Sequence, residues 1–122
     1  MPRLLLVEDN ALLLRLYQAL LEEGGHQVRA ASCVAEALCA LGVETPEVLV
    51  MDLRLPELED GLRLLRAVPK GATRIVVISG WTADLAECPE RFRVDRILAK
   101  PVRLEALLAC VHECGAGPQP AI

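Results

Sequence analysis

Five polar side chains stand directly at the ends of short apolar runs in this sequence. They are Glu8, Asp9, Asp52, Ser79 and Lys100. Carboxylates, a hydroxyl and an ammonium group are suited to phosphoryl transfer, because that reaction depends on positioning and on the neutralisation of charge. If the fold brings these groups together, Asp52 is the candidate nucleophile and would form an aspartyl phosphate.

The three carboxylates would repel one another unless a cation lies between them. Oxygen ligands select a hard cation, and Mg²⁺ held by one or two carboxylates keeps positions open for phosphoryl oxygens. Lys100 would supply a second positive charge, and Ser79 would donate a hydrogen bond to another phosphoryl oxygen. Each residue has an ordinary alternative, such as a helix cap at Asp9 or a turn at Ser79. Their shared placement favours one functional site.

The apolar runs that precede these residues are expected to be strands. The runs cover residues 4–7, 48–51, 75–78 and 97–99, with a weaker one at 28–31. Continuous apolar residues are typical of parallel strands covered on both faces. Helical patterns lie between them, which predicts a doubly wound, flavodoxin-like α/β fold with five parallel strands in the order 2-1-3-4-5. Ligands bind such sheets at the carboxyl ends of the strands, where the strand order reverses, and the five polar residues fall at that edge.

Spacing and helix-ending residues define the expected helices. They cover 11–23, 34–41 with Ser32 as a candidate N-cap, 61–68 behind Asp60, and 104–113. Pro89 divides the segment 82–94, and a proline inside a helix costs about 3 kcal/mol. A short helix that restarts near Pro89, or a partly unwound one, is therefore expected there.

Composition limits the class of protein. The 122 residues correspond to one domain, expected over residues 1–114, with a flexible tail or linker over 115–122. The net charge of −4, without a basic tract, disfavours direct contact with nucleic acid. Because no apolar run reaches about 18 residues and no signal-peptide pattern is present, we expect a cytoplasmic protein without membrane contact.

The five cysteines show no C-x-x-C spacing and are expected to be reduced thiols. Cys110 and Cys114 would share one helix face, while His112 would point away from both. This arrangement argues against a metal site at that helix.

Four short motifs resemble the receiver domains of two-component response regulators. They are LLLVEDN at 4–10, VLVMDLRLP at 48–56, VVISG at 76–80 and AKP at 99–101. The resemblance covers roughly residues 3–114, and the motifs are specific in their combination and spacing. It implies a signalling switch that receives a phosphoryl group on Asp52 from a sensor histidine kinase or a phosphotransfer protein and then alters a partner interaction. It implies no enzyme activity beyond the chain's own phosphorylation and dephosphorylation.

The resemblance also implies a role for each site residue. Mg²⁺ would be bound by the acceptor aspartate, by Asp9 and by the backbone carbonyl of Arg54, and Glu8 would act through water. Ser79 would hydrogen-bond the phosphoryl group and be drawn toward it. Lys100 would bridge toward the phosphorylated acceptor.

Three departures from the family pattern affect the expected switch, and one of them is the interruption of the segment 81–95 by Pro89. The loop at 56–61, after the acceptor strand, is one residue longer than usual. Ile97 stands where the family carries a Tyr or Phe that swings inward, and simple core packing is the alternative for this aliphatic residue. Trp81 and Arg54 occupy two positions that tune dephosphorylation. A bulky Trp81 beside Arg54 predicts a shielded phosphate, with surface packing of Trp81 as the alternative.

Two other functions stay open at the level of the sequence. A phosphatase with an aspartyl-phosphate intermediate needs a second Asp two residues after the nucleophile, and this position is Arg54, which cannot do acid–base work. A pseudo-receiver that docks partners independently of phosphorylation agrees with Ile97 and Pro89, whereas the five polar residues argue against it. The sequence leaves open the cognate kinase, the output, homodimer formation and whether the chain acts alone or within a longer protein.

Overall fold

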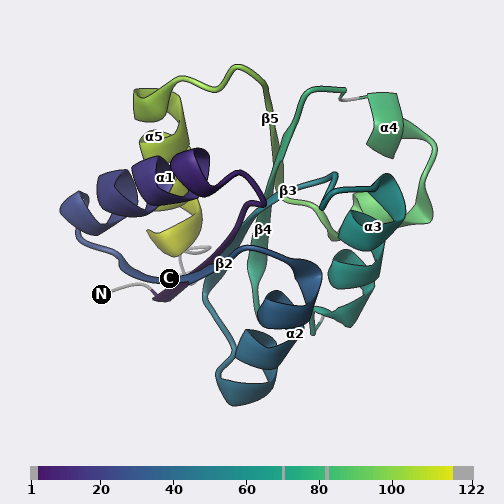
Figure 1. Cartoon of the computed structure of the whole chain (residues 1–122), viewed down its shortest axis with the longest axis horizontal. Helices are drawn as coiled ribbons and strands as arrows, with labels where there is room; N and C mark the ends of the chain where they lie inside the picture. Colours follow the sequence, from purple (N-terminus) through teal and green to yellow (C-terminus); the bar gives the residue numbers. More distant parts are fainter. Residues whose placement is uncertain (1–2, 70, 82, 117–122) are drawn as a thin grey trace, which may run out of the picture.

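The computed structural model describes residues 3–69, 71–81 and 83–116. Its centre is a five-stranded parallel sheet in the order β2-β1-β3-β4-β5. Helices flank this sheet on both sides (Figure 1). The strands are β1 Arg3–Val7, β2 Gln27–Ala31, β3 Val48–Asp52, β4 Arg74–Ser79 and β5 Arg96–Ala99. The predicted fold class and strand order are confirmed.

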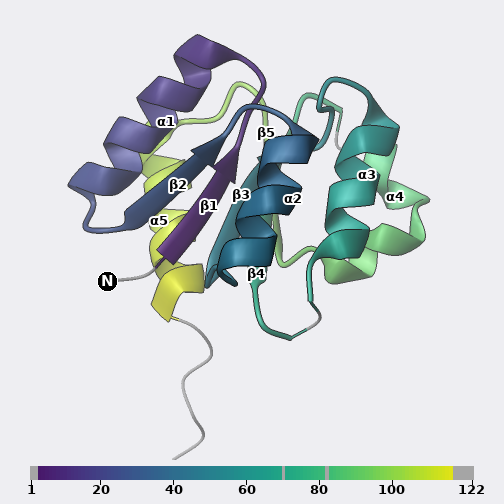
Figure 2. The ribbon, with the colours of Figure 1, turned by 60° about the horizontal axis from the view of Figure 1, so that its bottom comes forward.

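Helices cover both faces of the sheet (Figure 2). One face carries α1 (Ala11–Glu23) and α5 (Leu104–Ala116). The other carries α2 (Val34–Val43), α3 (Leu58–Ala67), α4 (Ala83–Ala86) and the 3-10 helix η1 (Pro89–Arg93). Within the described residues, none of these helices has the length and apolar character that a membrane crossing requires.

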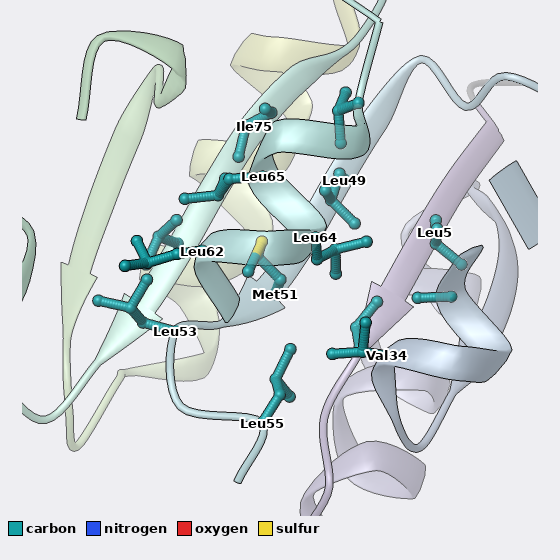
Figure 3. Close-up of a cluster of buried hydrophobic side chains, with 14 of the residues drawn as sticks. Leu5, Val34, Leu49, Met51, Leu53, Leu55, Leu62, Leu64, Leu65 and Ile75 are labelled. Carbon is teal, nitrogen blue, oxygen red and sulfur yellow. The ribbon is translucent and has the colours of Figure 1, made fainter. Parts of the chain in front are cut away.

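Alternate residues of β3 point to opposite faces of the sheet. Leu49 and Met51 pack under α2 and α3, in the cluster that Figure 3 shows together with Leu64. Val48 and Val50 pack under α1 and α5. Burial on both faces explains the continuous apolar run in the sequence. Each fully buried aliphatic side chain of this kind contributes about 1.5–3 kcal/mol to folding.

The start of α3 differs from the sequence prediction. The helix begins at Leu58 rather than at Gly61, and Asp60 is its third residue rather than the residue before it. The Asp60 carboxylate accepts a hydrogen bond from the Glu57 N–H at 3.2 Å, as part of a capping box. Gly61 lies against the preceding strand, since a Cβ at this position would be 1.7 Å from the carbonyl oxygen of Leu53. A glycine is therefore required for the close approach of α3.

The start of α2 also needs a correction. Cys33, not Ser32, occupies the N-cap position. The N–H and the hydroxyl of Ser32 both donate to the carboxylate of Glu36, at 2.6 and 2.7 Å. Ser32 thus ties the chain to the first turn of the helix through a side chain rather than as its cap.

Three further expectations concern the second half of the chain. The interruption at Pro89 is confirmed, because α4 ends at Ala86 and η1 begins at Pro89. Helix α5 extends to Ala116, beyond the expected domain end at 114, and the rest of the expected tail, 117–122, lies outside the described residues. Ile97 lies on the edge strand β5 and is 43% exposed, so simple core packing is wrong for this residue. An edge strand has a neighbouring strand on one side only.

Candidate functional site

The carboxyl ends of the parallel strands bring the acidic residues together. Glu8 and Asp9 follow β1, and Asp52 is the last residue of β3, the strand paired with β1. Carboxylate oxygens of these three residues all lie within 4.8 Å of one another. Glu8 and Asp52 are buried, whereas Asp9 is exposed. Such a cluster carries a surplus of negative charge at the topological switch point of the sheet.

Lys100 brings a positive charge to this cluster from the end of β5. Its Nζ lies 2.6 Å from Asp52 Oδ2 and 3.8 Å from Glu8 Oε1. The Lys100 N–H donates to the carbonyl of Ser79 at 2.9 Å, which fixes the backbone that carries the ammonium. One ammonium faces three carboxylates, so the site has the charge and the oxygen donors that suit a divalent cation.

The electrostatics of the site follow from burial and from these contacts. Burial raises the pKa of Glu8 above its usual value, although the hydrogen bond from the Asn10 N–H at 3.0 Å opposes this shift. Burial alone would lower the pKa of Lys100, but the hydrogen bond to Asp52 and the negative charge around it raise that pKa overall. The ammonium therefore stays charged, and the buried carboxylates gain from any further positive charge.

Ser79 ends β4 beside the acidic cluster. Its side chain is buried, and its Oγ accepts a hydrogen bond from the Trp81 N–H at 3.1 Å. That bond does not use the hydroxyl hydrogen, which remains able to donate. The indole of Trp81 belongs to a residue that is 69% exposed. The structure thus gives Trp81 the surface position that was the alternative to phosphate shielding.

Arg54, two residues after the end of β3, connects this strand to α4. Its N–H donates to Asp52 Oδ1 at 3.3 Å, and its guanidinium pairs with Asp84 at 2.9 Å. The sequence reasoning had not singled out Asp84. Asp84 lies in the segment that Pro89 divides, and no pattern in the sequence indicates a pair 30 residues apart.

The cysteine-rich end of α5 lies apart from this cluster. Cys110 and Cys114 are both buried, while the exposed His112 contacts His26, with 3.1 Å between Nδ1 and Nε2. The two thiols and the imidazole therefore point in different directions, as the helical spacing predicts.

The strand order and the place of the acidic cluster define a flavodoxin-like α/β domain with its site at the carboxyl edge of the sheet. The sequence model of the response regulator receiver domain matches residues 4–112. This chain belongs to that family of two-component signalling domains.

Relatives and solved structures agree with this assignment. The chain is 44% identical over 121 residues to the transcriptional regulatory protein PhoP of Escherichia coli, covering 87% of this chain and 52% of PhoP. It is 34% identical over 114 residues to the virulence transcriptional regulatory protein PhoP of Salmonella typhimurium, covering 89% and 50%. The chain thus spans about half the length of the curated relatives it matches.

Two solved structures illustrate the similarity of the fold. A CheY-like receiver domain from Methylobacillus flagellatus superposes with a TM-score of 0.79 at 27% identity, covering 93% of this chain and 98% of that one. The response regulator TrrA from Thermotoga maritima, in complex with Mg²⁺ and BeF, superposes with a TM-score of 0.81 at 20% identity, covering 93% and 99%.

Proposed function

We propose that this chain is a phospho-receiver switch in which Asp52 accepts a phosphoryl group in a Mg²⁺-dependent reaction. The observation that carries the proposal is the 2.6 Å contact between Lys100 Nζ and Asp52 Oδ2 within a cluster of three carboxylates. This arrangement holds the candidate nucleophile beside one positive charge and leaves negative charge for a metal ion to balance. Membership of the receiver family supports the same assignment.

In the proposed transfer, a carboxylate oxygen of Asp52 attacks the phosphorus of a phosphohistidine on a sensor histidine kinase or phosphotransfer protein. A P–O bond forms and the P–N bond breaks. The electron pair of the P–N bond passes to the imidazole ring of that histidine. The ring departs as a neutral leaving group when its other nitrogen carries a proton. Water later attacks the phosphorus, releases inorganic phosphate and restores the carboxylate. The chain would thus catalyse only its own phosphorylation and dephosphorylation and would not be an enzyme in the usual sense.

The donor set fits Mg²⁺, because carboxylate oxygens are hard ligands and carry more negative charge than one ammonium balances. Asp9, Asp52 and the backbone carbonyl of Arg54 would hold the ion, and Glu8 would act through water. When bound, Mg²⁺ supplies positive charge to the oxygens of the transferring group.

Lys100 and Ser79 would stabilise the phosphorylated form. The ammonium of Lys100 already lies beside Asp52 and would pair with one phosphoryl oxygen. The Ser79 hydroxyl would donate to another phosphoryl oxygen and move toward it. These two contacts would turn the chemical event into a displacement of the loop that follows β4.

The proposed input partner is a sensor histidine kinase or phosphotransfer protein, and the output is a downstream domain or protein. The PhoP relatives are named transcriptional regulators and are about twice as long as this chain. Within such a protein this domain would control the output rather than contact nucleic acid itself, since its net charge is −4. We propose that the switch acts in the cytoplasm. A homodimer of the phosphorylated chain is one form that its output would take.

Incubation with acetyl phosphate and Mg²⁺, followed by intact-mass measurement, tests the proposal. Wild-type protein and Asp60→Asn, a matched control at the start of α3, should both gain one phosphoryl group, and Asp52→Asn should gain none. Chelation of Mg²⁺ should abolish labelling in all three proteins. Equal labelling of Asp52→Asn would overturn the proposal. An unlabelled wild type would favour the pseudo-receiver, and turnover of simple phosphate esters would favour a phosphatase.

A further inference from the structure

The ion pair between Arg54 and Asp84 joins the acceptor loop to the first turn of α4. Arg54 Nε and Nη2 each lie 2.9 Å from Asp84 Oδ2. The arginine side chain is 47% exposed and the aspartate side chain 18% exposed. A pair that is half in water contributes little to stability, so its partners can exchange at low cost.

A second connection links Asp84 to the pocket through the backbone. The Asp84 N–H donates to the carbonyl of Trp81 at 3.0 Å, and the Trp81 N–H donates to Ser79 Oγ at 3.1 Å. The start of α4 is therefore attached at two points to the acceptor site, once through Ser79 and once through Arg54. Both attachments involve residues that lie within two positions of a strand end.

Helix α4 is short enough for these attachments to matter. It has four residues, Ala83–Ala86, and a helix of this length has no stability of its own in water. Leu85 anchors it in the core, and the Cys88 thiol donates to the carbonyl of Asp84 at 3.2 Å. The position of α4 thus depends on tertiary contacts, and among the residues that the structure describes the Arg54 pair is the contact that carries charge.

Phosphorylation would change the charge next to Arg54. Its N–H already donates to Asp52 Oδ1 at 3.3 Å, so its backbone borders the acceptor carboxylate. Phosphorylation replaces the single charge of the carboxylate with a phosphoryl group that carries about 1.5–2 negative charges, and it brings several strong acceptor oxygens. A guanidinium binds phosphate oxygens through two parallel hydrogen bonds, a better match than a single carboxylate oxygen.

We propose that Arg54 acts as a charge-sensing latch, by which we mean an ion pair that changes partner on phosphorylation. In the unphosphorylated protein its guanidinium binds Asp84. When Asp52 is phosphorylated, the guanidinium binds the phosphoryl oxygens instead, and α4 is released. This inference rests on the proposed function and gives it a route of transmission. Ile97 stands where the family resemblance leads one to expect an aromatic ring. The pair of Arg54 and Asp84 connects the phosphorylation site to the same side of the molecule without that ring.

The latch is tested by two-dimensional NMR of the full chain with and without acetyl phosphate in Mg²⁺. The amide signals of Glu87 and Cys88 report on the end of α4, three and four residues after the substituted Asp84. In unphosphorylated Asp84→Asn these signals should already move toward their positions in the phosphorylated wild type. The released fraction relative to the latched one should rise up to about fivefold, the range for an exposed ion pair. Phosphorylation should then move the signals less than in the wild type.

Glu90→Gln is the matched control, because Glu90 accepts from Arg66 at 2.7 Å and joins η1 to α3 away from the acceptor. It should keep the full response of the wild type. If Asp84→Asn does not fold, Arg54→Gln opens the same latch from the other side. Full phosphorylation with an unchanged response in the latch variants overturns the latch alone. Absence of phosphorylation in the wild type, measured in parallel by intact mass, overturns the proposed function and the latch with it.

Discussion

Lys100 is the cation that the structure places against the buried carboxylates, so its removal should be costly in the absence of metal. We consider Lys100→Gln, which keeps the length and some hydrogen bonding of the side chain but removes the charge. The ammonium lies 2.6 Å from Asp52, and the two side chains are 31% and 10% exposed. Loss of one partner from a fully buried pair costs about 3–5 kcal/mol, and the partial exposure of Lys100 lowers this to about 2 kcal/mol.

The assay is urea unfolding in metal-free buffer and again in saturating Mg²⁺. In the proposed function Mg²⁺ binds the folded state, and it should then stabilise Lys100→Gln more than the wild type, because it replaces the missing positive charge. The difference between the two proteins should therefore fall below about 1 kcal/mol in Mg²⁺. Arg96→Gln, which breaks an exposed pair with Glu113 at 3.2 Å, is the control and should show no measurable loss. Two results would refute this reasoning. One is that Lys100→Gln unfolds with the same free energy as the wild type, and the other is that its loss of stability is the same with and without Mg²⁺.

Three more predictions concern other parts of the fold. Gly61→Ala should lose about 2–3 kcal/mol in urea unfolding despite the better helix propensity of alanine, because its Cβ would be 1.7 Å from a backbone oxygen. Gly42→Ala in α2 meets nothing within 4 Å and should gain up to about 1 kcal/mol from the helix propensity of alanine. Equal stability of the two variants would contradict the packing of α3. Burial and the charge of His112 lower the pKa of His26. The contribution of neutral His26 to stability is therefore complete above pH 6.5 and is lost as the pH falls from 6.5 through the lowered pKa. His26→Gln should flatten the fall in stability below pH 6.5, and an unchanged slope would refute this. Burial raises the pKa of Cys110 to about 11, so alkylation of this thiol at pH 8 should be slow in the folded protein and fast after unfolding. Rapid alkylation of Cys110 in the folded protein would argue against its burial.

The strands were predictable from the sequence because their burial has a simple cause. Residues 48–51 are apolar without alternation, and the structure covers both faces of this strand. The polar residues that end each run then mark the carboxyl edge of the sheet. A single short motif would not have been sufficient, but several at corresponding strand ends restrict the fold strongly.

The remaining features depend on contacts that a linear pattern does not show. The sequence prediction starts α3 too late, because an acidic stretch after a proline is also typical of a loop. In the structure Glu57 and Asp60 form a capping box, so the helix begins before Gly61. The exposure of Ile97 depends on its place at the sheet edge rather than on its type. The pairing of Arg54 with Asp84 joins two segments 30 residues apart and needs the positions of both.

The measurement closest to the central claim is chemical identification of the phosphorylated residue. After incubation with acetyl phosphate and Mg²⁺, borohydride reduces an aspartyl phosphate to homoserine, which tandem mass spectrometry locates in the sequence. We predict homoserine at position 52 and at neither position 8 nor position 9. Reduction at another carboxylate, or labelled protein with an intact Asp52, would contradict the assignment of Asp52 as the phosphoryl acceptor.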